Sequence, residues 1–322
     1  MPKVSVIIPV YGAEKYIERC ARSLFGQTLD DVEYIFVDDC TPDRSMEVLR
    51  DVLAEYPARR PQVKILRTDV NSGQHVARQL GIEACTGDYV THCDPDDAYS
   101  CPDALESAYL TAIEDTADIV WWDMIVENEL SGNRTISSQC TNAEKGQILE
   151  TFLIDFSIMA SLCNRLVKSK LVKLKSIVKP VSPINEDTLL VAQYHLESKT
   201  PKYLPRPFYV YFRHSGSTTG TESNAERLLD RQRKVKNNFD LLFNLLQNNY
   251  PAIYKALSHA IDFRKYHIKS IIVPALTELP TKMWTSIYPE INFRIYLNSY
   301  LSLIQKRLAF MIESRIFRLI HK

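Results

Sequence analysis

The sequence predicts an α/β protein with a mostly parallel sheet, helices on both faces of that sheet, and a C-terminal helical region. Over the first hundred residues, short β-branched apolar runs alternate with segments of helical period. This alternation is typical of βαβ units, which build parallel sheets with right-handed crossovers. All nine glycines lie at or before Gly220, and the apolar spacing from Asn224 onward is helical. We therefore expect the last third of the chain to be helical.

The first hundred residues contain four expected strands and three expected helices. The run KVSVIIPV is short, β-branched and ended by Pro9, as in a buried strand. The next segment repeats apolar side chains at helical spacing, and the later run EYIFVD leads straight into acidic residues. In order, we expect strand 3–10, helix 13–26, strand 33–38, helix 45–56, strand 62–67, helix 74–85 and strand 88–93.

The middle third of the sequence is less regular. The runs DIVWWDMIV (118–126) and FYVYF (208–212) indicate strands. Helical spacing covers residues 146–160 and the run TLLVAQYHLE that follows Asp187. Between these two helices, we expect a short basic turn within residues 162–174.

The composition excludes several classes of protein. With 322 residues, 45% hydrophobic and 24% charged side chains and zero net charge, the chain is too apolar to be disordered and lacks the basic surplus of nucleic-acid-binding proteins. Its seven cysteines are odd in number and show no CxxC spacing, so we expect reduced thiols. The N-terminal apolar run is shorter than a signal peptide, and no run reaches the ~18 residues of a membrane span. We therefore expect a cytoplasmic protein.

Acidic residues collect where the expected strands end. Asp94, Asp96 and Asp97 follow the fourth strand, and Asp38 and Asp39 end the second. In open parallel sheets, ligands bind beyond the carboxyl ends of the strands. Close carboxylates repel each other unless a cation neutralises them, and their oxygens suit Mg²⁺ or Mn²⁺. The alternative is that Asp-Pro-Asp-Asp forms only a turn and that Asp39 is a loop or helix-capping acid.

Three segments together resemble the family 2 glycosyltransferases that have a GT-A fold. They are VSVIIPVYGAEKYIERCARSLFGQT, VDDCTPDRS and NSGQHVARQLGIEACTGDYVTHCDPDD. The resemblance covers residues 3–100 closely and extends more loosely, through Asn185-Glu186-Asp187 and RHSGS, to about residue 220. It implies a Rossmann-like nucleotide-diphospho-sugar transferase fold and the transfer of a sugar to an acceptor hydroxyl.

The resemblance also implies roles for particular residues. Glu186 and Asp187 match a motif whose Asp acts as general base on the acceptor. Asp96, Asp97 and His214 are expected to hold a divalent cation, Mn²⁺ or Mg²⁺. The residues expected to contact the nucleotide-diphosphate sugar are Pro9, Val10, Tyr11, Glu14, Asp38, Asp39, Asn71, Gly73, Arg78, Asp94 and Asp96.

Without the resemblance, several of these positions have plainer explanations. Glu186 and Asp187 would be acids favoured by a helix dipole, and Arg78 would be an exposed helix residue. His214 is equally consistent with a structural polar residue. The paired tryptophans at 121–122 either stack on a sugar face or belong to the core.

The resemblance implies a metal-dependent glycosyltransferase that inverts the sugar by single displacement. The expected donor is a UDP-sugar, and the expected acceptor is a glycan or lipid-linked hydroxyl in cell-surface polysaccharide synthesis. We expect a donor-binding half at 1–100, an acceptor-binding half at 101–222 and a basic helical region at 223–322. The alternatives are an inactive GT-A-fold scaffold or glycan-binding subunit, and a nucleotidyltransferase, which would usually carry a Gly-rich basic loop after its first strand.

The last hundred residues are basic. From Ser223 to Lys322 the sequence has 16 Lys and Arg against 7 Asp and Glu. Since the net charge of the whole chain is zero, the residues before Ser223 carry a matching acidic surplus. A basic amphipathic helix within 291–322 suits peripheral contact with the inner face of the cell membrane. The alternatives are that this helix packs on the domain or in a homodimer, or that the basic clusters attract an anionic glycan.

Overall fold

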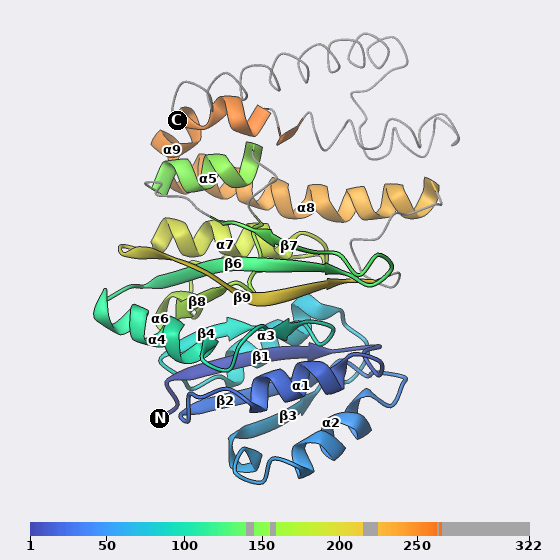
Figure 1. Cartoon of the computed structure of the whole chain (residues 1–322). Coiled ribbons are helices and arrows are strands. Elements are labelled where there is room, and N and C mark those ends of the chain that lie inside the picture. Colours follow the sequence, from blue (N-terminus) through green and yellow to red (C-terminus); the bar gives the residue numbers. More distant parts are fainter. Residues whose placement is uncertain (140–144, 155–158, 215–224, 263, 266–322) are drawn as a thin grey trace.

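The computed structural model of the chain describes residues 1–139, 145–154, 159–214, 225–262 and 264–265. In these residues nine strands form one sheet, and helices cover both of its faces (Figure 1). The expected α/β class is confirmed. The helix expected within 291–322, on which the membrane and homodimer interpretations depend, lies outside the described residues.

The first half of the chain folds as four parallel strands joined by helices, in the expected order. Its elements are β1 (Val4–Val10), α1 (Ile17–Phe25), β2 (Val32–Asp38), α2 (Ser45–Ala54), η1 (Arg60–Gln62), β3 (Val63–Arg67), α3 (Gln74–Ala84) and β4 (Tyr89–His92). β1 pairs in parallel with both β2 and β4, and β2 pairs in parallel with β3. Every residue of β1, β2 and β4 is buried, which explains why these strands read as continuous apolar runs.

The second half adds strands of both directions. Its elements are β5 (Ala98–Tyr99), α4 (Ala104–Glu114), β6 (Ile119–Asn128), β7 (Arg134–Ser137), α5 (Lys145–Ile154), β8 (Arg165–Lys168), α6 (Ser169–Val172), α7 (Glu186–Glu197), β9 (Pro201–Arg213), α8 (Ala225–Asn249) and α9 (Pro251–Ala256). The strands are arranged as β3-β2-β1-β4-β8-β6-β9-β5, and β7 pairs with β6. β9 lies parallel to β6, and β8 lies antiparallel between β4 and β6.

One sequence expectation in this half is wrong. Residues 162–174 were expected to contain a basic turn, but they contain β8 and α6. β8 is only four residues long, so its sequence cannot display a strand period, and its pairing with two distant strands determines its conformation. The two-residue β5 and the mostly exposed β7 also went unpredicted, for the same lack of a local signal.

Two hydrophobic cores lie on opposite faces of the sheet. α1, α2 and α4 cover one face, and their buried residues pack with Val6, Ile8 and Phe36. α3 and α7 cover the other face and pack with Ile7 and Ile35. α8 packs on the outer side of α7 and contributes to the second core (Figure 1). The start of the basic C-terminal region is therefore part of the same folded body.

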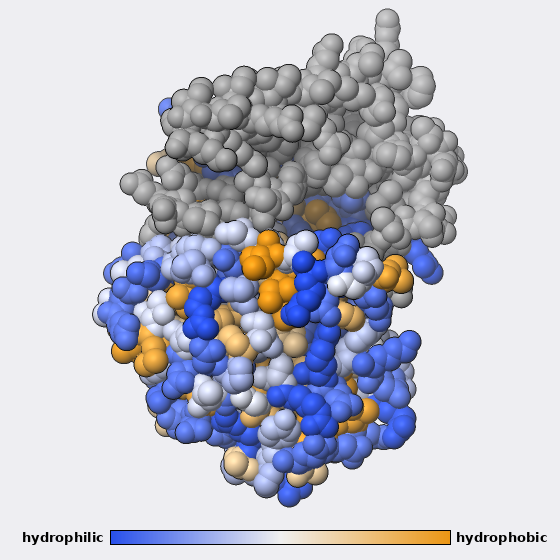
Figure 2. Space-filling model, viewed as in Figure 1, coloured by the Kyte–Doolittle hydropathy of each residue, from blue (hydrophilic) through white to orange (hydrophobic). Residues whose placement is uncertain are grey.

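Where Figure 2 colours the surface, it is mainly hydrophilic, with separate apolar areas. Among the residues that the structure describes, no helix has the length and apolarity needed to cross a bilayer.

Candidate active site

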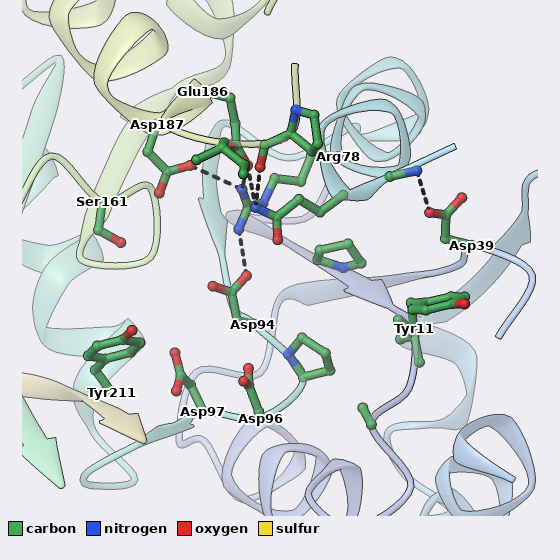
Figure 3. Close-up of a pocket in the computed structure, with 18 of the residues that line it drawn as sticks. Tyr11, Asp39, Arg78, Asp94, Asp96, Asp97, Ser161, Glu186, Asp187 and Tyr211 are labelled. Carbon is green, nitrogen blue, oxygen red and sulfur yellow. Dashed lines mark hydrogen bonds and ion pairs between the residues drawn. The ribbon is translucent and has the colours of Figure 1, made fainter. Parts of the chain in front are cut away.

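A cavity of about 610 Å³ opens beyond the carboxyl ends of β1, β2 and β4. Asp39 and Tyr11 lie at one end of it, and Asp187, Ser161 and Tyr211 lie at the other (Figure 3). The sequence-predicted site residues that line the cavity are Pro9, Val10, Tyr11, Asp39, Asn71, Gly73, Arg78, Asp94, Asp96, Asp97, Glu186, Asp187 and His214. Residues from six separate segments of the sequence thus meet in one space.

Asp39 is a buried carboxylate at the Tyr11 end of the cavity. Its Oδ1 accepts hydrogen bonds from the Thr68 hydroxyl (2.8 Å) and the Ser72 N–H (2.9 Å), and its Oδ2 accepts one from the Gly73 N–H (2.7 Å). Gly73 has a φ of +87°, which glycine adopts without strain. Because a carboxylate offers about four acceptor positions, these three bonds leave room for one N–H group of a ligand.

Glu14 and Asp38 are not among the residues that line the cavity. Glu14 accepts a hydrogen bond from the Arg44 N–H (3.0 Å), and its own N–H donates to Asp43 (3.0 Å). Asp38 accepts one from the Thr41 N–H (2.8 Å). Both acids hold the loops that follow β1 and β2 through hydrogen bonds. The sequence alone does not distinguish this structural role from direct contact with a ligand.

Arg78 joins acids that are far apart in the sequence. Its Nη1 donates to Glu186 Oε1 (2.6 Å) and Asp187 Oδ1 (3.0 Å), and its Nη2 donates to Asp94 Oδ1 (2.6 Å). Gln74 also donates to Glu186 Oε1 (2.6 Å). The guanidinium lies between the acids of α7 and the acid that follows β4 (Figure 3). With its side chain only 3% exposed, Arg78 is not the exposed helix residue that its position alone suggested.

The charges of this cluster are coupled. Burial opposes the charge on Arg78, but Asp94, Asp187 and Glu186 together outweigh it and raise the pKa of Arg78 well above its ordinary value. Burial, and then the neighbouring Asp187, raise the pKa of Glu186 to about 8, against the effect of Arg78. Burial also raises the pKa of Asp187, and Arg78 opposes that shift too. Glu186 is therefore expected to hold its proton at pH 7.

Replacing Glu186 with glutamine should flatten the pH dependence of stability. The folded protein keeps the Glu186 proton up to a pKa of about 8, whereas the ordinary value is 4.5, so the free energy of unfolding falls as pH rises between these values. As the pH rises from 5 to 8, the free energy of unfolding of Glu186→Gln should increase by about 2 kcal/mol or more relative to that of the unaltered protein. Urea unfolding without nucleotide or metal measures this gain.

The exposed Glu114, at the end of α4, provides a matched control for that experiment. Glu114→Gln should follow the unaltered protein at every pH. If the free energy of unfolding of Glu186→Gln differed from that of the unaltered protein by the same amount at pH 5 and pH 8, Glu186 would not hold a buried proton.

The Asp-Pro-Asp-Asp segment is a turn that β9 holds in place. Within the turn, the Asp97 N–H donates to the Asp94 carbonyl (3.1 Å). The Asp97 carboxylate accepts hydrogen bonds from the Phe212 N–H and the Tyr209 hydroxyl, both at 2.8 Å. The turn proposed as the plain alternative is thus present, and it also places Asp94 and Asp96 in the cavity lining. A role for Asp97 as a metal ligand stays a prediction.

Asp96 and His214 form the pair best suited to a divalent cation. His214 Nε2 lies 2.9 Å from Asp96 Oδ2, and the His214 ring packs against Tyr16 in a tilted arrangement, with 4.3 Å between ring centroids. Burial, and then Asp94, raise the pKa of Asp96, as a carboxylate beside another acid requires. Among the described residues, no three His, Cys, Asp or Glu side chains surround a metal position. The pair nevertheless fits Mg²⁺ or Mn²⁺, which often take few protein ligands and complete their coordination with substrate phosphates and water.

Asn238, which the sequence analysis did not identify, holds the segment that precedes α7. Asn238 on α8 is 1% exposed, and its Nδ2 donates to the carbonyls of Ser182 (3.0 Å) and Ile184 (2.9 Å). Its Oδ1 accepts a hydrogen bond from the Val181 N–H (3.2 Å). Asn185 then takes a left-handed φ of 64° before α7 begins. No motif marks Asn238, because its importance arises only when α8 packs against α7.

The two tryptophans belong to the core. Trp122 is fully buried and packs on Phe208, with 6.0 Å between ring centroids. Trp121 is 4% exposed and packs edge-on against His195. Neither lines the cavity, so the sugar-stacking interpretation is wrong for both. β9 instead places the ring of Tyr211 at the cavity wall.

Solved structures with this fold are GT-A-type glycosyltransferases. The structure of S. aureus TarS in complex with UDP-GlcNAc matches with a TM-score of 0.60 and 18% identity, covering 94% of this chain and 79% of that one. The mannosyltransferase PcManGT from Pyrobaculum calidifontis, in complex with GDP-Man and Mn²⁺, matches with a TM-score of 0.58 and 16% identity, covering 100% of this chain and 88% of that one. The expected GT-A fold is confirmed.

The sequence matches then place the chain within one family. Residues 5–171, just over half of the chain, match the model of glycosyl transferase family 2. The chain is 28% identical over 222 residues to the putative glycosyltransferase EpsH of Bacillus subtilis, covering 67% of this chain and 62% of EpsH. The first curated relatives are matched over 28% to 62% of their own length. The chain belongs to glycosyl transferase family 2.

Proposed function

We propose that this enzyme transfers a sugar from a UDP-sugar to a hydroxyl of a glycan or lipid-linked acceptor. The bridge that Arg78 makes between Asp94 and Asp187 carries the proposal. It places the acid turn, where a diphosphate and a cation would bind, beside a carboxylate that would act as base. The nucleotide sugars in the two structural neighbours support a donor of this class.

In the proposed reaction, Asp187 is the general base. Its carboxylate takes the proton of the acceptor hydroxyl while the hydroxyl oxygen forms a bond to C1 of the sugar. The bond between C1 and the diphosphate oxygen breaks, and the diphosphate leaves with the electron pair. Because one displacement joins attack and departure on opposite faces, the anomeric centre inverts. The Leu162 N–H, 3.1 Å from Asp187 Oδ2, and Arg78 on Oδ1 orient the base.

The donor would lie along the length of the cavity. At one end, Asp39 would accept the N–H of the uracil, and Tyr11 and Asn71 would line the nucleoside pocket. In the middle, Asp96 and His214 would hold Mn²⁺ or Mg²⁺, which when bound neutralises charge on the leaving diphosphate. Glycan and lipid-linked hydroxyls are the acceptors of cell-surface polysaccharide synthesis, which is the process that we propose for this enzyme.

Asp96→Asn should weaken metal-dependent donor binding. The change removes the anionic ligand beside His214, so the Mn²⁺ concentration for half-maximal UDP binding should rise at least ~10-fold. UDP binding without metal should change little. Isothermal titration with UDP over a Mn²⁺ series measures both values.

The exposed Asp88 precedes β4 and lies at its opposite end, so it offers a matched control for Asp96. Asp88→Asn should leave the Mn²⁺ dependence unchanged. Equal half-saturating Mn²⁺ in Asp96→Asn and the unaltered protein would remove Asp96 as a ligand.

A donor panel tests the proposed function itself. The purified protein is incubated with UDP-sugars and GDP-sugars in the presence of Mn²⁺, and the released nucleotide is identified. Release of UDP supports glycosyl transfer. In a second incubation with nucleoside triphosphate and sugar phosphate in place of the nucleotide sugars, release of pyrophosphate would identify a nucleotidyltransferase. Binding of glycans without release of nucleotide from any donor would identify an inactive scaffold.

A further inference from the structure

The hydroxyl of Tyr209 connects the two ends of the acid turn. The Asp94 N–H donates to Tyr209 Oη (2.9 Å), and the Tyr209 hydroxyl donates to Asp97 Oδ2 (2.8 Å). The other oxygen of Asp97 accepts the Phe212 N–H (2.8 Å). One tyrosine of β9 therefore bonds the first residue of the turn through its backbone and the last through its side chain.

These bonds are buried and have a fixed direction. Tyr209 is fully buried and Asp97 is 1% exposed, so water cannot replace a lost bond easily. A backbone N–H can only donate, so Tyr209 Oη must accept from Asp94 and is left to donate its own hydrogen to Asp97. The ring of Tyr209 is fixed as well, because it packs edge-on against Tyr99 with 5.8 Å between centroids.

Asp96 lies between these two anchored residues. Its carbonyl accepts a hydrogen bond from Arg19 (2.5 Å), and its carboxylate meets His214 (2.9 Å). The backbone of the turn therefore sets the direction of the Asp96 carboxylate. Tyr209 holds both ends of that turn, through the Asp94 N–H and the Asp97 carboxylate. Loss of the Tyr209 hydroxyl or of the Asp97 carboxylate would leave the turn free to change its orientation. The side chains of Asp96 and His214 would themselves be unaltered.

We propose that Tyr209 is a positioning residue, with Asp97 as its anchor, and that together they aim Asp94 and Asp96 at the cation and diphosphate. This inference rests on the proposed function, because it concerns the donor site of that reaction. It assigns Asp97 to holding the turn, whereas the family resemblance suggested a metal ligand.

Tyr209→Phe tests the inference because it removes one hydroxyl and keeps the ring. Mn²⁺ binding is followed by electron paramagnetic resonance in the presence of UDP or GDP, whichever the unaltered protein binds more tightly. The half-saturating Mn²⁺ should rise about tenfold, within the range seen when groups that orient metal ligands are lost. At saturating Mn²⁺, turnover of the donor should return to within a few-fold of the unaltered protein, since no reacting group has changed.

Tyr89→Phe is the matched control. Tyr89 on β4 is 2% exposed, and its hydroxyl donates to the Ala117 carbonyl (2.8 Å) outside the cavity lining. Its loss should lower thermal stability and leave the half-saturating Mn²⁺ unchanged. An equal shift in both variants would show that Tyr209 acts only through general stability and would overturn the inference.

Asp97→Asn gives an independent test, also in the event that Tyr209→Phe does not fold. Asparagine still accepts the Phe212 N–H but turns an N–H group toward Tyr209, so the Tyr209 hydroxyl loses the acceptor of its own hydrogen. The Mn²⁺ shift should be smaller than that of Asp96→Asn. A loss of Mn²⁺ binding as complete as in Asp96→Asn would make Asp97 a ligand and overturn its anchoring role.

Failure of the inference can be told apart from failure of the proposed function. If the unaltered protein binds neither UDP nor GDP with Mn²⁺, the proposed donor site is wrong, and the inference is overturned with it. If the unaltered protein binds and Tyr209→Phe has the same half-saturating Mn²⁺, the inference alone is overturned.

Discussion

Asp187→Asn is expected to abolish sugar transfer while leaving donor binding nearly unchanged. Asparagine keeps the shape of the side chain but has a single oxygen, so it can accept a hydrogen bond from either Arg78 or the Leu162 N–H but not from both, and it cannot take a proton. A general base contributes about 10²- to 10⁴-fold, so turnover should fall by that factor. The affinity for UDP with Mn²⁺ should stay within a few-fold.

Initial rates of UDP release and titration of UDP separate these two effects. Glu197→Gln, at the other end of the same helix, should keep full turnover, since Glu197 lies outside the cavity lining. If Asp187→Asn kept more than about a tenth of the turnover, Asp187 would not be the base.

Arg78→Met should cause the largest loss of stability among the changes considered. Methionine fills a similar volume but leaves Asp94, Glu186 and Asp187 without their shared cation. Removal of one partner from a buried ion pair costs about 3–5 kcal/mol. The loss should be larger at pH 8 than at pH 5, because Glu186, whose pKa is raised to about 8, holds its proton at the lower pH and then needs no cation beside it.

Denaturant unfolding at the two pH values checks this expectation. Arg22 makes ion pairs of similar length at the surface, with Glu18 at 2.9 Å and Glu55 at 2.8 Å, so Arg22→Met is a matched control that should hardly move the midpoint. Arg78→Lys should remain impaired, because an ammonium group cannot bridge three acids as a guanidinium fork does. Equal losses for Arg78→Met and Arg22→Met would show that the Arg78 cluster contributes little to stability.

The first half of the fold could be predicted because its information is local. β1 and β2 are buried on both faces, so their sequences are unbroken apolar runs, and helical periods fill the intervals. The acids that follow β2 and β4 then meet because parallel strands bring their carboxyl ends to one edge. For this reason Asp39 and Asp94 could be assigned to one cavity before their positions were known.

The remaining features depend on pairings between distant segments. A helix position alone predicts an exposed Arg78, and only the packing of α3 beside α7 shows that it serves three acids. The bond between Tyr209 and Asp97 forms because β9 returns to the sheet beside β5, 112 residues along the chain from the acid turn. Glu14 and Asp38 show the opposite case, in which residues that match a motif support a loop rather than line the cavity.

The hydrogen bonds of Asn238 to the segment before α7 limit how the C-terminal region of this protein can change. The change in net charge near residue 222 suggests that residues 223–322, the tail, could be replaced as one unit. However, Asn238 and the Lys234 carbonyl form hydrogen bonds with Ser182 and Ile184 and so fix the path of the chain there. A tail borrowed from a relative would shift the carboxylate of Asp187 unless it supplied an equivalent amide at that position. The tail and the position of the proposed base are therefore expected to evolve together.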